Sequence, residues 1–327
     1  MTAVLMSNAV VAAQYLARGI AHFRQNQFAE AIAAFDAALQ INPDDCYARW
    51  NRATALLSIG DYARGFVEHD VAWRLFNWRG FGPIGNDIDR LQALPLWRGE
   101  EGVRLLAYHE LGFGDAIMAM RYLPELRCKT NLTLVIDQCL ARLARAFDIE
   151  VIDRLPDDLT VFDYRLPFFG VMSALKQTED TIPAAPYIAP HWRRSGGKLG
   201  IAWSGRTQTS FTLERFLSLF AHDGFALYAL QPGPLADDRV EPLPAGSDFV
   251  DVGVRITEMD HIVSVDTAAI HLAGAMGHPS AHLLLPYLMD WRWWRSTAWY
   301  PTLKIYRQVS ADDWSTPFAR LNERLIA

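Results

Sequence analysis

The hydrophobic periodicity of this chain changes once, near residue 103, and this change restricts the folds open to it. Before that point, residues 10–78 have the spacing of amphipathic helices. After it, short apolar runs alternate with helical stretches, a pattern typical of βα units around a parallel sheet. With 327 residues, the chain is long enough for two domains or three small ones. The sequence therefore predicts a helical module followed by an α/β region.

The helical part contains a repeat of 34 residues, in which Pro43 ends the first copy and His69 replaces Phe35 in the second. Small residues recur at this spacing in three pairs: Gly19 and Ala53, Ala31 and Gly65, Ala38 and Ala72. The pattern resembles the tetratricopeptide repeat. Two repeats are few for an independent solenoid, so we expect them to pack on another part of the protein. Two uses stay open: a brace for the next domain, or a groove for a peptide or protein partner.

Composition and cysteine usage exclude several classes of protein. The chain has 31 basic and 37 acidic residues, a net charge of −6, which disfavours a nucleic-acid binder. Its three cysteines, Cys46, Cys128 and Cys139, form no CxxC pair, so we expect a reducing, cytoplasmic location and neither a zinc site nor a disulfide frame. The uncharged start, 1–17, lacks a basic leader and is interpreted as helix, and no apolar run reaches the roughly 18 residues of a membrane span.

The expected organisation is a helical repeat module over 1–78, a glycine-rich connector over 79–102, and two Rossmann-like domains over 103–190 and 191–327. Ten strands are predicted in the α/β region, over residues 104–109, 132–136, 150–152, 162–166, 199–203, 225–230, 249–252, 261–265, 281–285 and 303–307.

The first candidate site follows the strand over 104–109. Gly112, Phe113 and Gly114 form a turn, and Asp115 begins the next helix. Asp115 would lie at the carboxyl edge of the sheet, where open α/β sheets bind ligands, and could accept a proton from a hydroxyl nucleophile. The alternative is an N-cap aspartate, which satisfies the free backbone amides of the following helix.

The second candidate site lies where a buried strand ends in Asp266 and Thr267. The free amides of Thr267, Ala268 and Ala269, together with the helix dipole, would form an anion site suited to a diphosphate. His271 is four residues further along the same helix face and could donate to a phosphate or a sugar hydroxyl. The alternative is a capped helix with a satisfied histidine.

Two further segments carry groups that bind phosphate. Ser204, Gly205 and Arg206 follow a strand, and Arg206 could neutralise a leaving diphosphate. The segment 290–301 is rich in tryptophan, so a base or sugar could stack there while Arg292 pairs with phosphate. The alternative for this segment is a structural aromatic cluster.

One apparent metal motif is set aside. Asp87 and Asp89 match the DxD pattern that binds a metal–nucleotide complex in some glycosyltransferases, but such a match in a glycine-rich connector arises easily by chance. We therefore expect no metal site.

In their order along the chain, several of these pieces resemble bacterial tetratricopeptide-repeat glycosyltransferases whose catalytic half is similar to the heptosyltransferases, glycosyltransferase family 9. The residues that carry the resemblance are 51–53, 60–62, 110–121, 200–205, 264–277, 286–292 and 299–301. The resemblance implies a GT-B fold, two Rossmann-like domains with the active site in the cleft between them. The N-terminal domain would meet the acceptor, and the C-terminal domain would bind a nucleotide-sugar donor.

The resemblance also implies roles for single residues. Asp115 matches the proposed general base, and Asp266, Thr267, Ala268 and His271 match the donor-phosphate motif. The implied reaction is a metal-independent, inverting displacement without a cofactor.

The chain departs from the family pattern in two places of its donor half. The loop after Gly205 is short, with Thr209 near the expected arginine, and only 254–260 is available for the helix that precedes the strand over 261–265. Three hypotheses therefore stay open: an active sugar transferase, a degenerate relative that serves as a binding scaffold, and an enzyme of another class on the same fold, such as an epimerase.

Overall fold

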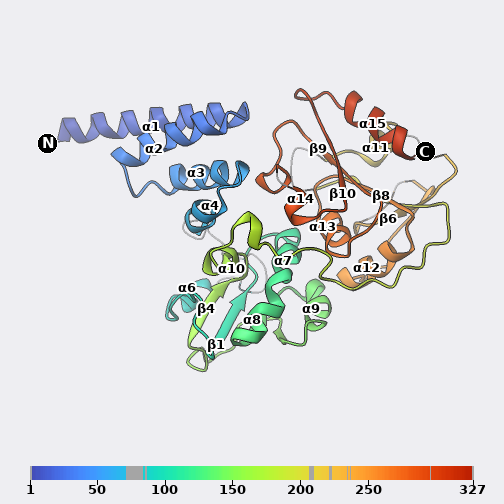
Figure 1. The fold of residues 1–327 in the computed structure, drawn as a ribbon, viewed down its shortest axis with the longest axis horizontal. Coiled ribbons are helices and arrows are strands. Elements are labelled where there is room, and N and C mark those ends of the chain that lie inside the picture. Colours follow the sequence, from blue (N-terminus) through green and yellow to red (C-terminus); the bar gives the residue numbers. More distant parts are fainter. Residues whose placement is uncertain are drawn as a thin grey trace.

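Within the chain, the computed structural model describes residues 2–70, 84, 87–205, 210–220, 223–233, 235, 237–294 and 296–325. A helical module comes first, and two parallel sheets flanked by helices follow it (Figure 1). The helical and α/β regions expected from the change of periodicity are therefore both present. In the described part of the chain, no helix has the length and apolar character needed to cross a bilayer.

The described residues of the helical module form four helices: α1 (Thr2–Arg24), α2 (Phe28–Ile41), α3 (Cys46–Ser58) and α4 (Tyr62–His69). Helix α1 packs on α2 and α3 packs on α4, which are the helix pairs that the 34-residue spacing predicts. A Cβ on Gly19 would lie only 2.4 Å from the Phe35 ring, so a larger residue there would separate the helices. In the second copy His69 packs against Trp50, with ring centroids 4.4 Å apart. Ala72 lies outside the described residues.

Helix α4 joins the module to the α/β region. Phe66 contacts Trp291 and Trp299 of the second half, with ring centroids 5.6 and 6.3 Å apart, and Phe169 of the first half at 6.5 Å. The repeats thus pack on another part of the protein, as expected, and these contacts support the brace. Trp291 and Trp299 are only 3% and 0% exposed, so the aromatic segment is a structural cluster and the expectation of a stacking platform for a base or sugar is wrong for these two rings.

The first half contains a parallel four-stranded sheet of order β3-β2-β1-β4. Its strands are β1 (Arg104–Tyr108), β2 (Asn131–Val135), β3 (Glu150–Ile152) and β4 (Tyr164–Pro167). The helices of this half are α6 (Ile88–Leu91), α7 (Phe113–Ala119), α8 (Leu123–Lys129), α9 (Gln138–Arg145) and α10 (Val171–Ala174). The strand order changes direction at β1, so the gap between β1 and β4 is the topological switch point, where sheets of this type bind ligands.

The second half contains a parallel six-stranded sheet of order β10-β9-β8-β5-β6-β7. Its strands are β5 (Lys198–Ala202), β6 (Ala226–Ala229), β7 (Val240–Glu241), β8 (His261–Ser264), β9 (Ala281–Leu285) and β10 (Leu303–Arg307). Its helices are α11 (Leu213–Leu217), α12 (Phe249–Glu258), α13 (Ala268–Ala275), α14 (Ser296–Trp299) and α15 (Ser315–Leu325). This is the strand order of dinucleotide-binding Rossmann folds, with its switch point between β5 and β8.

The predicted strand over 249–252 is wrong, because these residues begin helix α12. Asp248 accepts hydrogen bonds from the backbone N–H groups of Val250 and Asp251, and the Asp251 carboxylate accepts one from the N–H of Asp248. This reciprocal cap starts a helix, although the apolar run that follows looks like a strand. The full helix before β8 is therefore present, and one of the two departures from the family pattern disappears. The short strand β7 was not predicted.

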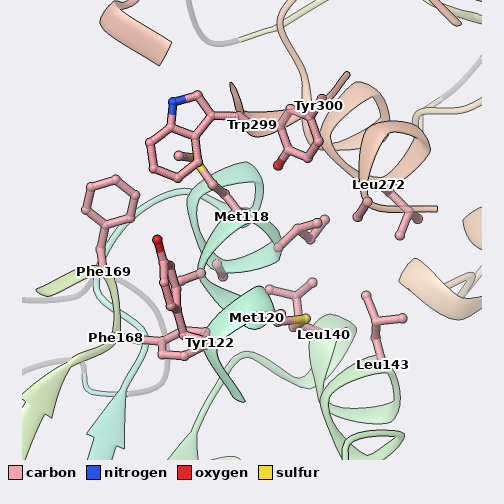
Figure 2. Close-up of a cluster of buried hydrophobic side chains, with 14 of the residues drawn as sticks. Met118, Met120, Tyr122, Leu140, Leu143, Phe168, Phe169, Leu272, Trp299 and Tyr300 are labelled. Atoms are coloured by element: carbon pink, nitrogen blue, oxygen red, sulfur yellow. The ribbon is translucent and has the colours of Figure 1, made fainter. Parts of the chain in front are cut away.

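One hydrophobic core runs through all three parts of the chain. Figure 2 shows part of this core, where Met118 of the first half lies near Trp299 of the second. Arg121 is 3% exposed and donates hydrogen bonds to the backbone oxygens of Met118, Pro183 and Trp299. Because this core is continuous, it fixes the position of one sheet edge relative to the other.

We expect acid to destabilise the second half through His278. In the neutral ring, Nε2 donates to Met259 O at 3.1 Å and Nδ1 accepts from Ser280 N at 3.1 Å. Burial lowers the pKa of His278 to about 4, whereas the unfolded chain titrates near 6.5. The contribution of neutral His278 to the free energy of unfolding is therefore complete above about pH 6.5. It is lost as the pH falls towards 4, and the loss amounts to about 3 kcal/mol at most. Urea unfolding of the wild type and His278→Gln at pH 7 and 4.5 measures this loss.

The His278→Gln variant should lose less stability on acidification than the wild type. His191→Gln is the matched control, because His191 is exposed. An equal loss in the wild type and His278→Gln would contradict the assignment.

Candidate active site

Asp115 lies on the first turn of α7, directly after β1. The N-cap residue is Gly112 rather than Asp115, which differs from the alternative interpretation. The N–H of Gly112 donates to Oδ2 of Asp115 at 2.9 Å, so Asp115 supports the start of the helix from its third position. Its Oδ1 forms an ion pair with Arg292, which comes from the second half of the chain. The Asp115 side chain is 22% exposed. The predicted base is therefore at once a support for the start of its helix, the partner of an arginine and partly open to solvent.

The loop that carries Asp115 touches the second half directly. A Cβ on Gly114 would lie 2.6 Å from Cδ2 of His271, so only glycine allows α7 to approach α13 this closely. Phe113 is 40% exposed and its ring contacts those of His109 and Phe249. The predicted acceptor-side loop and the predicted donor helix are thus neighbours, although they come from different sheets.

His271 is a buried residue with polar neighbours on both sides. Its Nδ1 lies 3.0 Å from the Tyr300 hydroxyl, and its Nε2 faces Oδ1 of Asp266 at 3.7 Å. Burial by itself would raise the pKa of Asp266, but the nearby His271 holds that pKa below its usual value. The geometry matches the satisfied histidine of the alternative interpretation.

Thr267 is the residue before α13 and has an extended backbone, with φ −142° and ψ 164°. No side chain of the described residues caps this helix end, and Thr267 Oγ1 instead lies 3.0 Å from Ser264 Oγ. The first N–H groups of α13, beginning with Ala268, therefore carry the positive end of the helix dipole without a side-chain cap from Thr267. This is the arrangement that the sequence predicts for a diphosphate.

The loops after β5 and β8 meet at the switch point of the second sheet. A Cβ on Gly205 would lie 2.4 Å from the backbone oxygen of Asp266, so this position requires glycine. Gln231 accepts hydrogen bonds from the N–H groups of Trp203 and Ser204, at 2.8 and 3.1 Å, and orients the start of the loop. Ser204 and Gly205 are therefore beside Asp266, as expected for one ligand site. Arg206 lies outside the described residues.

Arg292 connects the two halves. Its Nη1 contacts Oδ1 of Asp290 at 2.6 Å, and its Nη2 pairs with Asp115. The guanidinium lies over the rings of Trp291 and Phe169, 4.6 and 5.1 Å from their centroids. Although burial lowers the pKa of Arg292, the charges of Asp115 and Asp290 raise it overall. Arg292, which was predicted to bind phosphate, is therefore paired with two carboxylates in this structure.

Sequence reasoning missed Glu110, which lies two residues after the end of β1. Its carboxylate accepts hydrogen bonds from the N–H groups of Phe168 and Phe169, at 2.9 and 3.0 Å, and so joins the loops after β1 and β4. Burial raises the pKa of Glu110 to about 8. A carboxylate at the end of a strand was the available signal.

A second group that the sequence did not single out is Asp70, at the end of α4. Burial raises its pKa to about 6, against the opposing charge of Arg98 at 3.4 Å. Asp70, Arg98 and Glu110 line a cavity of about 40 Å³ together with His69, large enough for water. The helical module therefore reaches the edge of the first sheet's switch point.

The DxD match lies on helix α6 and the residue before it. Asp87 forms an ion pair with Arg90 at 3.5 Å, and Arg90 also donates to the backbone oxygens of Pro156 and Asp157. These contacts tie the segment to a loop of the first half.

Comparison with known proteins agrees with the N-terminal assignment. The family model of the tetratricopeptide repeat matches residues 12–45. Protein FlbA of Caulobacter vibrioides is 22% identical to this chain over an alignment 367 residues long. The alignment covers 94% of this chain and 60% of FlbA. The chain thus spans about three fifths of the length of this curated relative.

Two of the similar solved structures are of glycosyltransferases. TibC, an iron-containing dodecameric glycosyltransferase from enterotoxigenic E. coli, has 11% identity and a TM-score of 0.46, over 68% of this chain and 67% of that one. A mutant O-GlcNAc transferase of Thermobaculum terrenum has 14% identity and a TM-score of 0.31, over 96% of this chain and 85% of that one.

The architecture itself rests on this chain's own features, namely the matched repeat and the two strand orders. The chain therefore consists of a tetratricopeptide-repeat module followed by two Rossmann-like halves whose switch points meet, the two-sheet arrangement known as the GT-B fold.

Proposed function

We propose that this protein is a glycosyltransferase that moves a sugar from a nucleotide-sugar donor to a hydroxyl group of a protein, glycan or lipid acceptor. The donor would bind to the second half and the acceptor would be met by the first. The helical repeats would brace the two halves and contact a protein acceptor or partner. Because its three cysteines are free, we place the protein in the reducing cytoplasm.

The observation that carries the proposal is the meeting of the two switch points. Asp115 follows β1 at the first, and Thr267 follows β8 at the second. The contact between Gly114 and His271 joins the helices that begin there. A base and a diphosphate site on opposite sides of one boundary are what transfer between two substrates requires.

In the proposed step, Asp115 accepts the proton of the acceptor hydroxyl, and the oxygen attacks the anomeric carbon of the donor sugar. The bond from that carbon to the diphosphate oxygen breaks, and the diphosphate leaves with the electron pair. The N–H groups at the start of α13 would stabilise the charge that develops on it. Attack from the side opposite the leaving group inverts the anomeric configuration, and the step as written needs no metal ion.

A panel of nucleotide sugars tests the proposal by calorimetric binding and by release of nucleoside diphosphate, with and without EDTA. We expect at least one donor to bind and to turn over in both conditions. If no donor binds and none is turned over, the transferase proposal is wrong. Turnover that EDTA abolishes would contradict the metal-free step alone.

Replacing Thr267 by Trp should block the donor site. The indole would project from the N-cap position of α13 into the space in front of the first N–H groups, where the diphosphate is expected. We expect at least about a hundredfold loss of donor affinity, or about 2.8 kcal/mol. Thr160→Trp, on an exposed loop of the first half, is the matched control. Wild-type affinity in Thr267→Trp would move the phosphate site elsewhere.

A scaffold without catalytic activity is the second candidate, and one observation favours it. Both carboxylate oxygens of Asp115 already have partners, Gly112 and Arg292. On this view the ion pair is a permanent link between the halves. Donor binding without any turnover, with all plausible acceptors, would favour the scaffold.

A further inference from the structure

Arg292 has more N–H donors than the observed contacts use. Its two terminal nitrogens pair with Asp115 and Asp290, but its buried Nε has no hydrogen-bond partner among the described residues. A buried guanidinium N–H without an acceptor is costly, so this arrangement leaves capacity for a further acceptor. The Arg292 side chain is 11% exposed, so that acceptor would come from within the boundary between the halves.

Arg292 is surrounded by carboxylates, and an incoming anion would compete with them for its guanidinium. Asp115, Asp290 and Asp266 all act on this one guanidinium. A diphosphate placed at the start of α13 would add negative charge beside Asp266 and would attract the same arginine. The ion pair with Asp115 crosses the boundary between the halves, whereas Asp290 belongs to the same loop as Arg292. The contact with Asp115 is therefore the one that a bound ligand could replace.

The state of Asp115 points the same way. An acceptor hydroxyl that is to be deprotonated must donate to one of the two carboxylate oxygens. Oδ2 holds the N–H of Gly112, which fixes the first turn of α7, and Oδ1 holds Arg292. Release of Arg292 would free Oδ1 of Asp115 for the acceptor without disturbing the hydrogen bond from Gly112 that supports the start of the helix.

We propose that Arg292 is exchanged between Asp115 and the diphosphate of the donor, so that donor binding releases Asp115 for the acceptor. This rests on the proposed function and adds an order of events to it. Before the donor binds, Arg292 holds the halves together and covers the base. After it binds, Arg292 neutralises the diphosphate, and Asp115 becomes available. The exchange would keep the base covered until there is a sugar to transfer.

A double-mutant cycle tests the exchange without relying on turnover. The probes are ADP, GDP, UDP and CDP, and the affinity of the best ligand is measured by calorimetry for wild type, Asp115→Asn, Arg292→Gln and the double variant. If Asp115 competes with the diphosphate for Arg292, Asp115→Asn should bind about tenfold more tightly than the wild type. Arg292→Gln should bind more weakly, and in its background the gain from Asp115→Asn should vanish.

The outcomes separate the exchange from simpler effects. A gain that persists in the Arg292→Gln background would be plain removal of a negative charge and would overturn the exchange, as would unchanged affinity in Asp115→Asn. Asp137→Asn is the matched control, because Asp137 caps α9 at the same sheet edge through Cys139 N. An equal gain in this control would also overturn it.

Two further results complete the test. If Arg292→Gln does not fold, as judged by urea unfolding, Arg292→Lys replaces it in the double-mutant cycle. Lysine keeps the charge but lacks the two-pronged guanidinium, so the gain in affinity from Asp115→Asn should be smaller in its background. If no nucleoside diphosphate and no nucleotide sugar binds the wild type, the proposed function fails and the exchange fails with it. Binding without coupling overturns the exchange alone.

Discussion

Asp115→Asn should lower the rate of sugar transfer by about 10²- to 10⁴-fold, the usual contribution of a general base. The amide has nearly the same shape as the carboxylate, and its oxygen can still accept the hydrogen bond from Gly112 N that caps α7. It cannot take a proton from the acceptor hydroxyl. Initial rates with the donor and acceptor that the wild type accepts measure the loss, and donor affinity measured in parallel should not fall.

Asp137→Asn again serves as the matched control, since it removes a helix-capping carboxylate from the same sheet edge without touching Arg292. Its rate should stay within a few fold of the wild type. Unchanged turnover in Asp115→Asn would remove Asp115 as the base. The remaining role of Asp115 would then be the hydrogen bond from Gly112 and the ion pair.

Trp299→Ala should lower the free energy of unfolding by about 3–5 kcal/mol, the range for a buried tryptophan replaced by alanine. Trp299 is 0% exposed and packs against Tyr62 and Phe66 of the helical module and Trp291 of its own half. Its Nε1 donates to the Tyr62 hydroxyl at 3.2 Å. The substitution would therefore leave a cavity where the helical module meets the second half, and it would remove the hydrogen bond from Trp299 to the Tyr62 hydroxyl.

Urea unfolding followed by circular dichroism measures this loss, and limited proteolysis shows where the structure opens. We expect cleavage to increase first around α4, because the module loses its main contact there. Trp192→Ala is the matched control, since Trp192 is 36% exposed and should cost far less. A loss as small as that of the control would contradict the view that the repeats are a structural brace.

Much of the fold could be predicted because its signals are local. Nine of the ten predicted strands agree with observed strands within two residues, since the alternation of apolar runs and helices is read over short windows. The error at 249–252 is also local: Asp248 and Asp251 form a capping box, and three apolar residues after Asp248 concealed it. A closer reading of that cap would have predicted helix α12.

In the candidate site, too, the features with local sequence signals could be predicted. The turns at Gly114 and Gly205 and the helix starts near Asp115 and after Thr267 follow from short motifs, so the sequence alone indicated which residues lie at the sheet edges. Their roles could not be predicted. Asp115 supports its helix from the third position rather than from the N-cap, and the satisfied-histidine interpretation of His271 matches the geometry. Neither finding tests whether these residues act on a substrate.

By itself, the sequence determined the 34-residue helical repeat, the parallel α/β region and the position of each loop at a strand end, because these depend on contacts between near neighbours in the chain. Only the tertiary structure decided that Arg292 would pair with Asp115, 177 residues away, and that the tryptophans around it would be buried by α4. An ion pair between two such distant residues leaves no local pattern. It arises when a common core brings the edges of two separate sheets together, and that core is assembled from all three parts of the chain.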